Sequence, residues 1–216
     1  LFICVKGAVT DGHTYAADVV KKGARVVVAE REIEVPPEVT VVYVQDTRMA
    51  MALIAAAWYN YPAEKLKVIG VTGTKGKTTT TYMVKSILET AGYKVGLIGT
   101  IEAIIGDEVI PAGNTTPESL TIQEYFSRML EAGCQIAVME VSSQGLMFHR
   151  TAGFLFEIGI FTNIEPDHIG PAEHSSFDDY LECKSRLFRQ CKVGILNGDD
   201  THLERILEGH TCAVET

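Results

Sequence analysis

The residues with the clearest chemical potential lie in a glycine-rich segment, 71–78, whose sequence is VTGTKGKT. An apolar stretch precedes it and an expected helix follows it, which is the setting of a phosphate-binding loop. Glycines let backbone N–H groups turn toward phosphate oxygens, and the helix N-terminus adds partial positive charge. Within the loop, we expect Lys77 to reach the outer phosphates and Thr78 to ligate Mg²⁺. A glycine-rich turn with solvated lysines is the alternative.

A carboxylate, Glu140, ends a second apolar stretch, 135–141. Ligands of open α/β folds collect at the carboxyl ends of parallel strands. Because hard cations prefer oxygen ligands, Glu140 could hold Mg²⁺ together with Thr78. A surface glutamate at a strand end is the alternative.

An Asp-His pair, Asp167-His168, follows a third apolar stretch, 157–162. Its place after a strand puts His168 at the same expected sheet edge as the phosphate loop. Taken alone, the pair fits a structural histidine better than a metal ligand.

A lysine, Lys184, lies in an expected helix, 176–190. An ammonium group cannot ligate a cation, but a neutral lysine amine can add carbon dioxide and become a carbamate with ligand oxygens. Burial lowers the pKa of a lysine and makes this addition easier. The helix pattern alone favours an ordinary surface lysine paired with an acid.

The elements that must position these residues alternate along the chain. Strands are expected at 67–71, 94–98, 135–141, 157–162 and 193–196. Helices are expected at 77–91, 117–132, 176–190 and 200–208, and a hairpin at 101–110. Such alternation predicts βαβ units and an α/β fold with a mostly parallel sheet.

The first sixty residues predict a smaller α/β unit of their own. Strands are expected at 1–7, 25–29 and 39–44, with a short helix at 15–22. An alanine-rich helix is expected at 47–61, with Asp46 as N-cap and Pro62 as its end. We therefore place a domain boundary near 62–66, giving an N-terminal domain of residues 1–63 and a second domain of 64–216.

Composition excludes several classes of protein. The 216 residues are 46% hydrophobic and 22% charged, as in globular domains. Nineteen basic and 28 acidic residues give 19 − 28 = −9, which argues against nucleic-acid binding. No apolar run is long enough to span a bilayer. Five cysteines without C-x-x-C spacing predict reduced thiols and a cytoplasmic protein.

Taken together, the chain resembles the Mur ligase family, and within it the MurE branch. The matching segments are 1–7, 11–13, 46–48, 71–78, 114–117, 139–146, 149–150, 161–168 and 180–188. The resemblance implies a partial UDP-substrate domain followed by a partial P-loop ATPase domain. An amino-acid-binding C-terminal domain, absent from these 216 residues, is expected to follow.

The resemblance also implies a reaction, with ATP and Mg²⁺ as cofactors. An ATP-dependent ligase adds the third amino acid, diaminopimelate or lysine, to UDP-MurNAc-L-Ala-D-Glu through an acyl phosphate during peptidoglycan synthesis. The implied catalytic residues are Lys77, Lys184, Glu140 and His168. The implied metal ligands are Thr78, Glu140, His168 and carbamylated Lys184. The implied nucleotide-binding residues are Gly73, Thr74, Lys75, Gly76, Lys77, Thr78 and Thr79.

Substrate residues carry over from the same resemblance. The UDP-muramoyl-peptide is expected to contact Asn114, Thr115, Thr116, Ser142, Arg150, Asp46 and Arg48. Arg150 is the natural partner of its diphosphate or carboxylate, because the guanidinium fork matches those anions. The partners are thus the UDP-MurNAc-dipeptide and an amino acid, and the protein is expected to be a monomer.

Two other functions remain open at this point. A folylpolyglutamate-synthetase-like ligase shares the phosphate loop, although the segment before residue 67 speaks against it. A non-catalytic nucleotide-binding module is the second. Because a ligase must hold both reactants, the 216-residue chain alone is expected to be inactive or nearly so.

Overall fold

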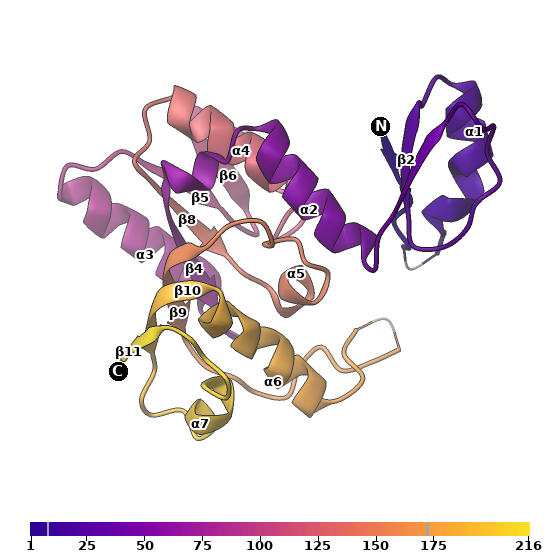
Figure 1. Cartoon of the computed structure of the whole chain (residues 1–216). Helices are drawn as coiled ribbons and strands as arrows, with labels where there is room; N and C mark the ends of the chain where they lie inside the picture. Colours follow the sequence, from indigo (N-terminus) through magenta and orange to yellow (C-terminus); the bar gives the residue numbers. More distant parts are fainter. Residues whose placement is uncertain (8, 172) are drawn as a thin grey trace.

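The computed structural model describes residues 1–7, 9–171 and 173–216. It contains two β-sheets, a small one formed near the N-terminus and a large one formed by the rest of the chain. Figure 1 shows the small sheet standing to one side, with helix α2 (Thr47–Trp58) leading from it to the larger body. The predicted α/β class with mostly parallel pairing is confirmed.

The small sheet is parallel throughout, in the order β1 (Phe2–Ile3), β2 (Val26–Ala29) and β3 (Thr40–Tyr43). Helix α1 (Ala16–Lys21) follows a 3₁₀ turn and connects the first two strands. The expected strand and helix positions agree within a few residues. Its apolar core consists of Cys4, Ala16, Val27, Ala29 and Val39.

Helix α2 begins where it was predicted to begin. The side chain of Asp46 accepts a hydrogen bond from the N–H of Met49 at 2.8 Å, which caps the first turn. The helix was predicted to reach residue 61 but ends at Trp58. Asn60 and Tyr61 adopt left-handed backbone conformations, with φ of 59° and 50°, which no α-helix can contain.

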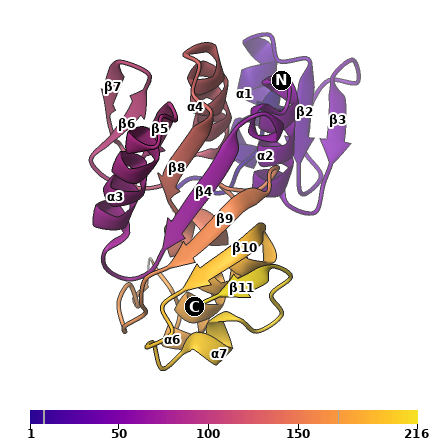
Figure 2. The same cartoon turned by 90° about the vertical axis from the view of Figure 1, so that its left-hand side faces the viewer.

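The large sheet has eight strands, which Figure 2 shows side by side. Its strands from one edge to the other are β11 (Ala213–Glu215), β10 (Cys191–Leu196), β9 (Phe156–Phe161), β4 (Lys67–Thr72), β8 (Ile136–Glu140), β5 (Val95–Ile98), β6 (Glu102–Ile105) and β7 (Glu108–Pro111). The expected hairpin forms β6 and β7, which pair antiparallel, and the pairs from β11 to β5 are parallel.

Helices cover both faces of this sheet. Helix α3 (Lys77–Thr90) packs Val84 and Leu88 against one face, where Ile69 and Val71 point. The other face holds the larger core, to which α4 (Ser119–Glu131) contributes Ile122 and α6 (Phe177–Ser185) contributes Tyr180 and Leu181.

Two further helices are shorter than predicted. The helix expected at 176–190 ends at Ser185 and tightens into a 3₁₀ turn, Arg186–Arg189. The helix expected at 200–208 is reduced to α7 (Leu203–Ile206), which buries only Ile206 fully and has little apolar area to stabilise more turns. Helix α5 (Ser143–Met147) and strand β11 were not predicted.

Strand order determines where the chemistry can lie. β4 pairs with β8 on one side and with β9 on the other, all parallel. The carboxyl ends of these strands therefore meet at one edge of the sheet, where residues 73–78, Glu140 and residues 162–168 follow. Within the described residues, no helix is long and apolar enough to cross a membrane.

Candidate active site at one edge of the sheet

The loop between β4 and α3 requires glycine at its first turn. Gly73 has φ of 149°, and a Cβ built there would lie 2.0 Å from Oγ1 of Thr162 and 3.0 Å from the carbonyl oxygen of Asn163. Gly76 has φ of 83° and precedes the first turn of α3 without a side-chain cap. The loop thus delivers the open N-terminus of α3 to the sheet edge, where its first N–H groups have no partner within the helix.

Asn163, which the sequence did not single out, holds the loop from the neighbouring strand. Its backbone oxygen accepts the N–H of Thr74 at 2.9 Å. Its side-chain oxygen accepts the N–H of Lys75 at 3.0 Å, and its side-chain amide donates to the Lys75 carbonyl at 3.1 Å. Its position directly after an apolar strand is a signal that could have identified it.

The side chains of Thr74 and Lys75 are also engaged with the protein. Thr74 Oγ1 lies 3.1 Å from the Tyr180 hydroxyl and accepts the N–H of Glu165 at 3.0 Å. Lys75 Nζ forms an exposed ion pair with Glu165 at 2.5 Å. In this arrangement both side chains fasten the loop to the segment after β9 and to α6.

Thr78 and Glu140, the expected metal ligands, lie together. Thr78 Oγ1 donates to Glu140 Oε1 at 2.9 Å. Thr100, another residue that the sequence did not single out, donates its N–H to the same oxygen at 2.8 Å and its hydroxyl to Oε2 at 3.0 Å. Glu140 is only 1% exposed. A buried carboxylate beside a hydroxyl is an all-oxygen donor set that fits Mg²⁺.

Lys77 and Lys184 both contact the loop through the carbonyl oxygen of Gly73. Lys184 is 1% exposed, and burial, followed by the nearby Lys77 charge, holds its pKa well below the usual lysine value. Burial also lowers the pKa of Lys77. Lys184 Nζ lies 4.5 Å from the ring centroid of Tyr180, a cation–π arrangement that offsets part of the burial penalty when the amine is protonated.

His168 is the most exposed of the four expected metal ligands. Its side chain is half exposed, its φ is 54°, and its Nδ1 lies 3.0 Å from Glu173 Oε1. Among the described residues, no hydrogen bond joins it to Thr78, Glu140 or Lys184.

A cavity of about 190 Å³ lies beside the loop and brings many of the expected residues together. The residues lining it that the sequence had proposed are Lys77, Asn114, Thr115, Thr116, Ser142, Arg150 and His168. Asp46, Arg48, Thr78, Glu140 and Lys184 are not among its lining residues. A phosphate chain on the loop and a second substrate can therefore meet at Lys77.

Some of these lining residues also fasten the site together. Thr116 is buried, donates to the carbonyl of Glu140 at 3.0 Å and accepts the N–H of Ser142 at 2.9 Å. Ser142 in turn caps α5 by accepting the N–H of Gly145 at 3.0 Å. The hydroxyl oxygens of Thr115 and Thr100 lie 3.0 Å apart.

Two arginines share one carboxylate at the entrance to this region. Glu118 pairs with Arg150 at 2.7 Å and with Arg48 at 3.5 Å. Both guanidinium groups lie against the ring of Phe148, at 4.7 Å for Arg48 and 5.8 Å for Arg150. Asp46 approaches His149 at 3.4 Å. The start of α2 is thereby joined to the large body by residues the sequence had placed near the substrate.

A larger cavity, of about 600 Å³, lies at the opposite ends of the strands and does not include the expected residues. Its lining includes Lys67 at the start of β4, Glu157 near the start of β9, and Tyr61. Lys192 and Glu157 form an ion pair of 2.8 Å in its wall.

Comparison with protein families identifies two matching regions. The Mur ligase family catalytic domain matches residues 1–59, and the Mur ligase middle domain matches residues 71–216. The second match alone covers more than half of the chain.

Individual proteins agree with the family matches. The chain is 49% identical over 209 residues to a UDP-N-acetylmuramoyl-L-alanyl-D-glutamate–2,6-diaminopimelate ligase of Caldanaerobacter subterraneus, covering 96% of this chain and 43% of the relative. The chain therefore spans less than half the length of this relative. A solved structure of a ligase with the same name matches with a TM-score of 0.78 and 26% identity, covering 94% of this chain and 42% of the other.

A second kind of neighbour shares the fold alone. The Mycobacterium tuberculosis folylpolyglutamate synthase complexed with ADP matches with a TM-score of 0.59 at 14% identity. That match covers 78% of this chain and 45% of the synthase.

Proposed function

The chain belongs to the Mur ligase family, and from that premise we propose that it is part of an ATP-dependent amide ligase of peptidoglycan synthesis. The reaction joins a third amino acid to UDP-MurNAc-L-Ala-D-Glu. The relative described above is named as a 2,6-diaminopimelate ligase, which supports diaminopimelate as that amino acid.

One observation carries the proposal: the cavity that places Lys77 of the loop beside Asn114, Thr116, Ser142 and Arg150. A nucleotide triphosphate on the loop has its terminal phosphate near Lys77. An acid held by the polar wall and by Arg150 lies within reach of the same point. Carboxylate activation requires this convergence.

The proposed chemistry has two steps. A carboxylate oxygen of the UDP-linked dipeptide attacks the γ-phosphorus of ATP, and the bond from that phosphorus to the β-phosphate oxygen breaks. ADP departs, and the dipeptide now carries an acyl phosphate. The amine of the amino acid then attacks the acyl carbon, phosphate departs, and the amine loses a proton. Lys77 offsets negative charge on the transferring phosphoryl group.

The donor set at the loop fits Mg²⁺. We propose that Thr78, Glu140, His168 and a carbamylated Lys184 hold it. The ion supplies charge neutralisation for the phosphates. Thr100 keeps the Glu140 carboxylate oriented through its 2.8 and 3.0 Å hydrogen bonds.

The state of Lys184 supports its carbamylation. The addition of carbon dioxide requires a neutral amine and releases a proton, and burial lowers the pKa of this lysine. In the full-length ligase, Lys184→Ala is expected to abolish ligation, with partial recovery from an added short carboxylate. Normal activity of the variant would remove Lys184 from the reaction.

The folylpolyglutamate-synthetase-like alternative is less well supported. It accounts for the fold from the phosphate loop onward, but the match to that synthase covers only 78% of this chain. The N-terminal match to the Mur ligases covers residues 1–59 as well. A non-catalytic nucleotide-binding module remains the second alternative, since the reaction requires the remainder of the protein.

Ligand-induced stabilisation separates these proposals. We expect the melting temperature of this chain to rise with Mg-ATP and with UDP-MurNAc-dipeptide, and not with folate. A response to folate alone would favour the synthetase reading, and a response to the nucleotide alone would favour the module. We also propose a cytoplasmic location, which the five free cysteines support.

A further inference from the structure

A cluster of side chains outside the loop brings together nitrogen, oxygen and sulfur ligand atoms. His174, Asp179 and Cys183 place their ligand atoms within 4.8 Å of one another. Asp179 and Cys183 lie one turn apart on α6, and His174 precedes the helix. The proposed catalytic chemistry uses none of the three.

The orphaned ring nitrogen of His174 points to a missing partner. The side chain is fully buried, and its Nε2 lies 2.8 Å from the Ser143 hydroxyl. Its Nδ1 has no hydrogen-bond partner and lies 3.6 Å from Asp179 Oδ2. A buried polar nitrogen without a partner is unfavourable, and one facing a carboxylate invites a proton or a cation.

The hydrogen bond to Ser143 favours the cation. When Nε2 donates its proton to the Ser143 hydroxyl, Nδ1 carries a bare lone pair. Metal-bound histidines are typically oriented in this way, with the second ring nitrogen donating to a neighbouring acceptor. The bare lone pair then faces two further electron-rich atoms, one from Asp179 and one from Cys183.

The spacing matches a tetrahedral ion of zinc size. Zn²⁺ binds nitrogen, oxygen and sulfur ligands at about 2.0–2.3 Å, so that two ligands of one tetrahedron lie about 3.3–3.7 Å apart. The observed separations are 3.6 Å from Nδ1 to Asp179 Oδ2 and 3.7 Å from Cys183 Sγ to the other oxygen of the same carboxylate, Oδ1. With one ligand atom taken from each residue, the three atoms lie within 4.8 Å of one another, so a small rotation of the Asp179 carboxylate brings a single oxygen between the other two ligands. A thiolate and an imidazole select Zn²⁺ over Mg²⁺.

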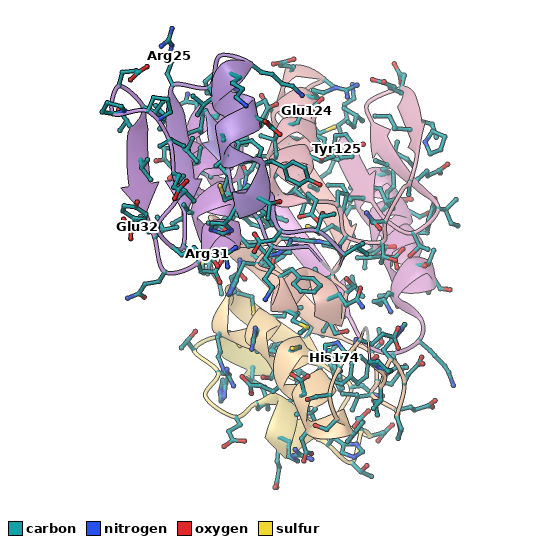
Figure 3. All side chains as sticks on the ribbon, turned by 90° about the vertical axis from the view of Figure 1, so that its right-hand side faces the viewer. Arg25, Arg31, Glu32, Glu124, Tyr125 and His174 are labelled. Atoms are coloured by element: carbon teal, nitrogen blue, oxygen red, sulfur yellow. The ribbon has the colours of Figure 1, made fainter. Side chains whose placement is uncertain are left out.

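We propose that His174, Asp179 and Cys183 form a Zn²⁺ site, with water as the fourth ligand on the side of the partly exposed Asp179. The Cys183 thiol loses its proton to solvent when the ion binds, and the thiolate and carboxylate together balance the charge of the ion. Figure 3 labels His174 in the large body, and Arg25 and Arg31 on the small unit.

The site has a structural consequence for α6. The ion joins the segment after β9, which carries His174, to the first two turns of the helix. Cys183 is adjacent to Lys184, so the ion also restrains the backbone that positions this buried lysine. The role is one of positioning and holds whether or not the proposed ligase reaction is correct.

Cobalt substitution tests the proposal. Co²⁺ added to the metal-free chain is expected to bind one equivalent and to produce a thiolate-to-cobalt charge-transfer band. Cys183→Ser is expected to remove this band and to weaken Zn²⁺ binding by at least about tenfold. Cys134→Ser, at a buried cysteine outside the cluster, is the matched control and is expected to keep both the band and the Zn²⁺ affinity. Glu140→Gln keeps the band as well, because the candidate magnesium site contains no sulfur.

Several outcomes would overturn the site. Absence of a charge-transfer band in the wild-type chain does so without any variant. A band that persists in Cys183→Ser, or that disappears equally in Cys134→Ser, does so too. If Cys183→Ser does not fold, Cys183→Ala provides the same test, and an unchanged Zn²⁺ affinity in that variant contradicts the proposal.

Discussion

Lys77 and Lys184 donate to the same oxygen. Their Nζ atoms lie 2.9 and 2.8 Å from the carbonyl of Gly73, although the two lysines are far apart in the sequence. The charge of Lys77 disfavours a second charge on Lys184, which is 1% exposed. The Lys184 amine therefore attaches the loop to α6, at a buried position where a positive charge on that amine is unfavourable.

This arrangement predicts a pH-dependent stability. Because the pKa of Lys184 is lower in the folded chain than in the unfolded one, folding releases protons, and wild-type stability rises with pH up to the ordinary lysine value. Lys184→Met lacks this dependence. In carbon-dioxide-free buffer it is expected to be more stable than wild type at neutral pH, by on the order of 1 kcal/mol or more, with the difference shrinking toward alkaline pH. Urea unfolding at several pH values measures it.

Lys192→Met is the control for this experiment, since Lys192 is exposed and pairs with Glu157. Its effect on unfolding is expected to be small. A Lys184→Met difference that does not change with pH would mean that the lysine folds without losing its proton.

Thr78 is predicted to act through the metal. Thr78→Val is expected to weaken Mg-ADP binding about tenfold, because a hydroxyl that contacts Glu140 at 2.9 Å is lost. Thr78→Ser retains the hydroxyl and is expected to bind nearly as wild type. Isothermal titration with and without Mg²⁺ checks this, and an equal loss in the absence of Mg²⁺ would contradict a role as metal ligand.

Gly73 is predicted to be intolerant of any side chain. Gly73→Ala places a Cβ 2.0 Å from Thr162 Oγ1 and is expected to destabilise the chain by more than about 2 kcal/mol. Thr162→Ala is expected to restore only part of this, since the Asn163 carbonyl remains 3.0 Å away. Gly92→Ala, where nothing lies within 4 Å, is expected to lose only about 1 kcal/mol from its positive φ. Equal losses at both glycines, measured by urea unfolding, would contradict the clash.

Glu118 is predicted to compete with an anionic substrate. It pairs with Arg150 at 2.7 Å, so Glu118→Gln frees the guanidinium and is expected to tighten UDP-MurNAc-dipeptide binding by about two- to fivefold. Arg150→Met is expected to weaken it at least tenfold. Glu124→Gln, which alters a 3.7 Å pair with Arg128 on the same helix, is the control. Weaker binding in Glu118→Gln, measured by titration calorimetry, would show instead that Glu118 orients the arginines for the ligand.

Tyr180 is predicted to titrate late. Burial raises its pKa to about 12, while its ordinary value is about 10. The folded chain thus retains this proton longer than the unfolded one, so the contribution is complete below pH 10 and is lost as pH rises toward 12. Tyr180→Phe is expected to lower the free energy of unfolding by about 1 kcal/mol at neutral pH, because the contact with Thr74 is lost. Above pH 10 the difference in unfolding free energy between wild type and variant is expected to narrow. A constant gap in unfolding free energy would contradict the raised pKa.

The sequence predicted the frame of the site because that frame is local. Alternating strands and helices imply a parallel sheet, and a parallel sheet places Thr78 and Glu140 at one edge. Hydrophobic periodicity predicts local helices and strands, and it does not predict contacts between segments far apart in the sequence. The bridge from Glu118 to Arg48 and the hydrogen bonds from Thr100 to Glu140 became evident only in the structure. Lys184 illustrates the limit, since its helix pattern alone favoured an exposed lysine and it is 1% exposed.

The site follows three interior strands of the sheet: β4 leads into the loop, β8 ends at Glu140, and β9 precedes Asn163. Each of these strands is hydrogen-bonded to a neighbour on both sides, whereas β11 and β7 are the edge strands of the sheet. Amide hydrogen exchange in β8, β4 and β9 should accordingly proceed only through global opening, while the edge strands exchange through local fluctuations. A substitution in β11 or β7 can therefore destabilise that edge strand without changing the geometry at the carboxyl ends of β4, β8 and β9.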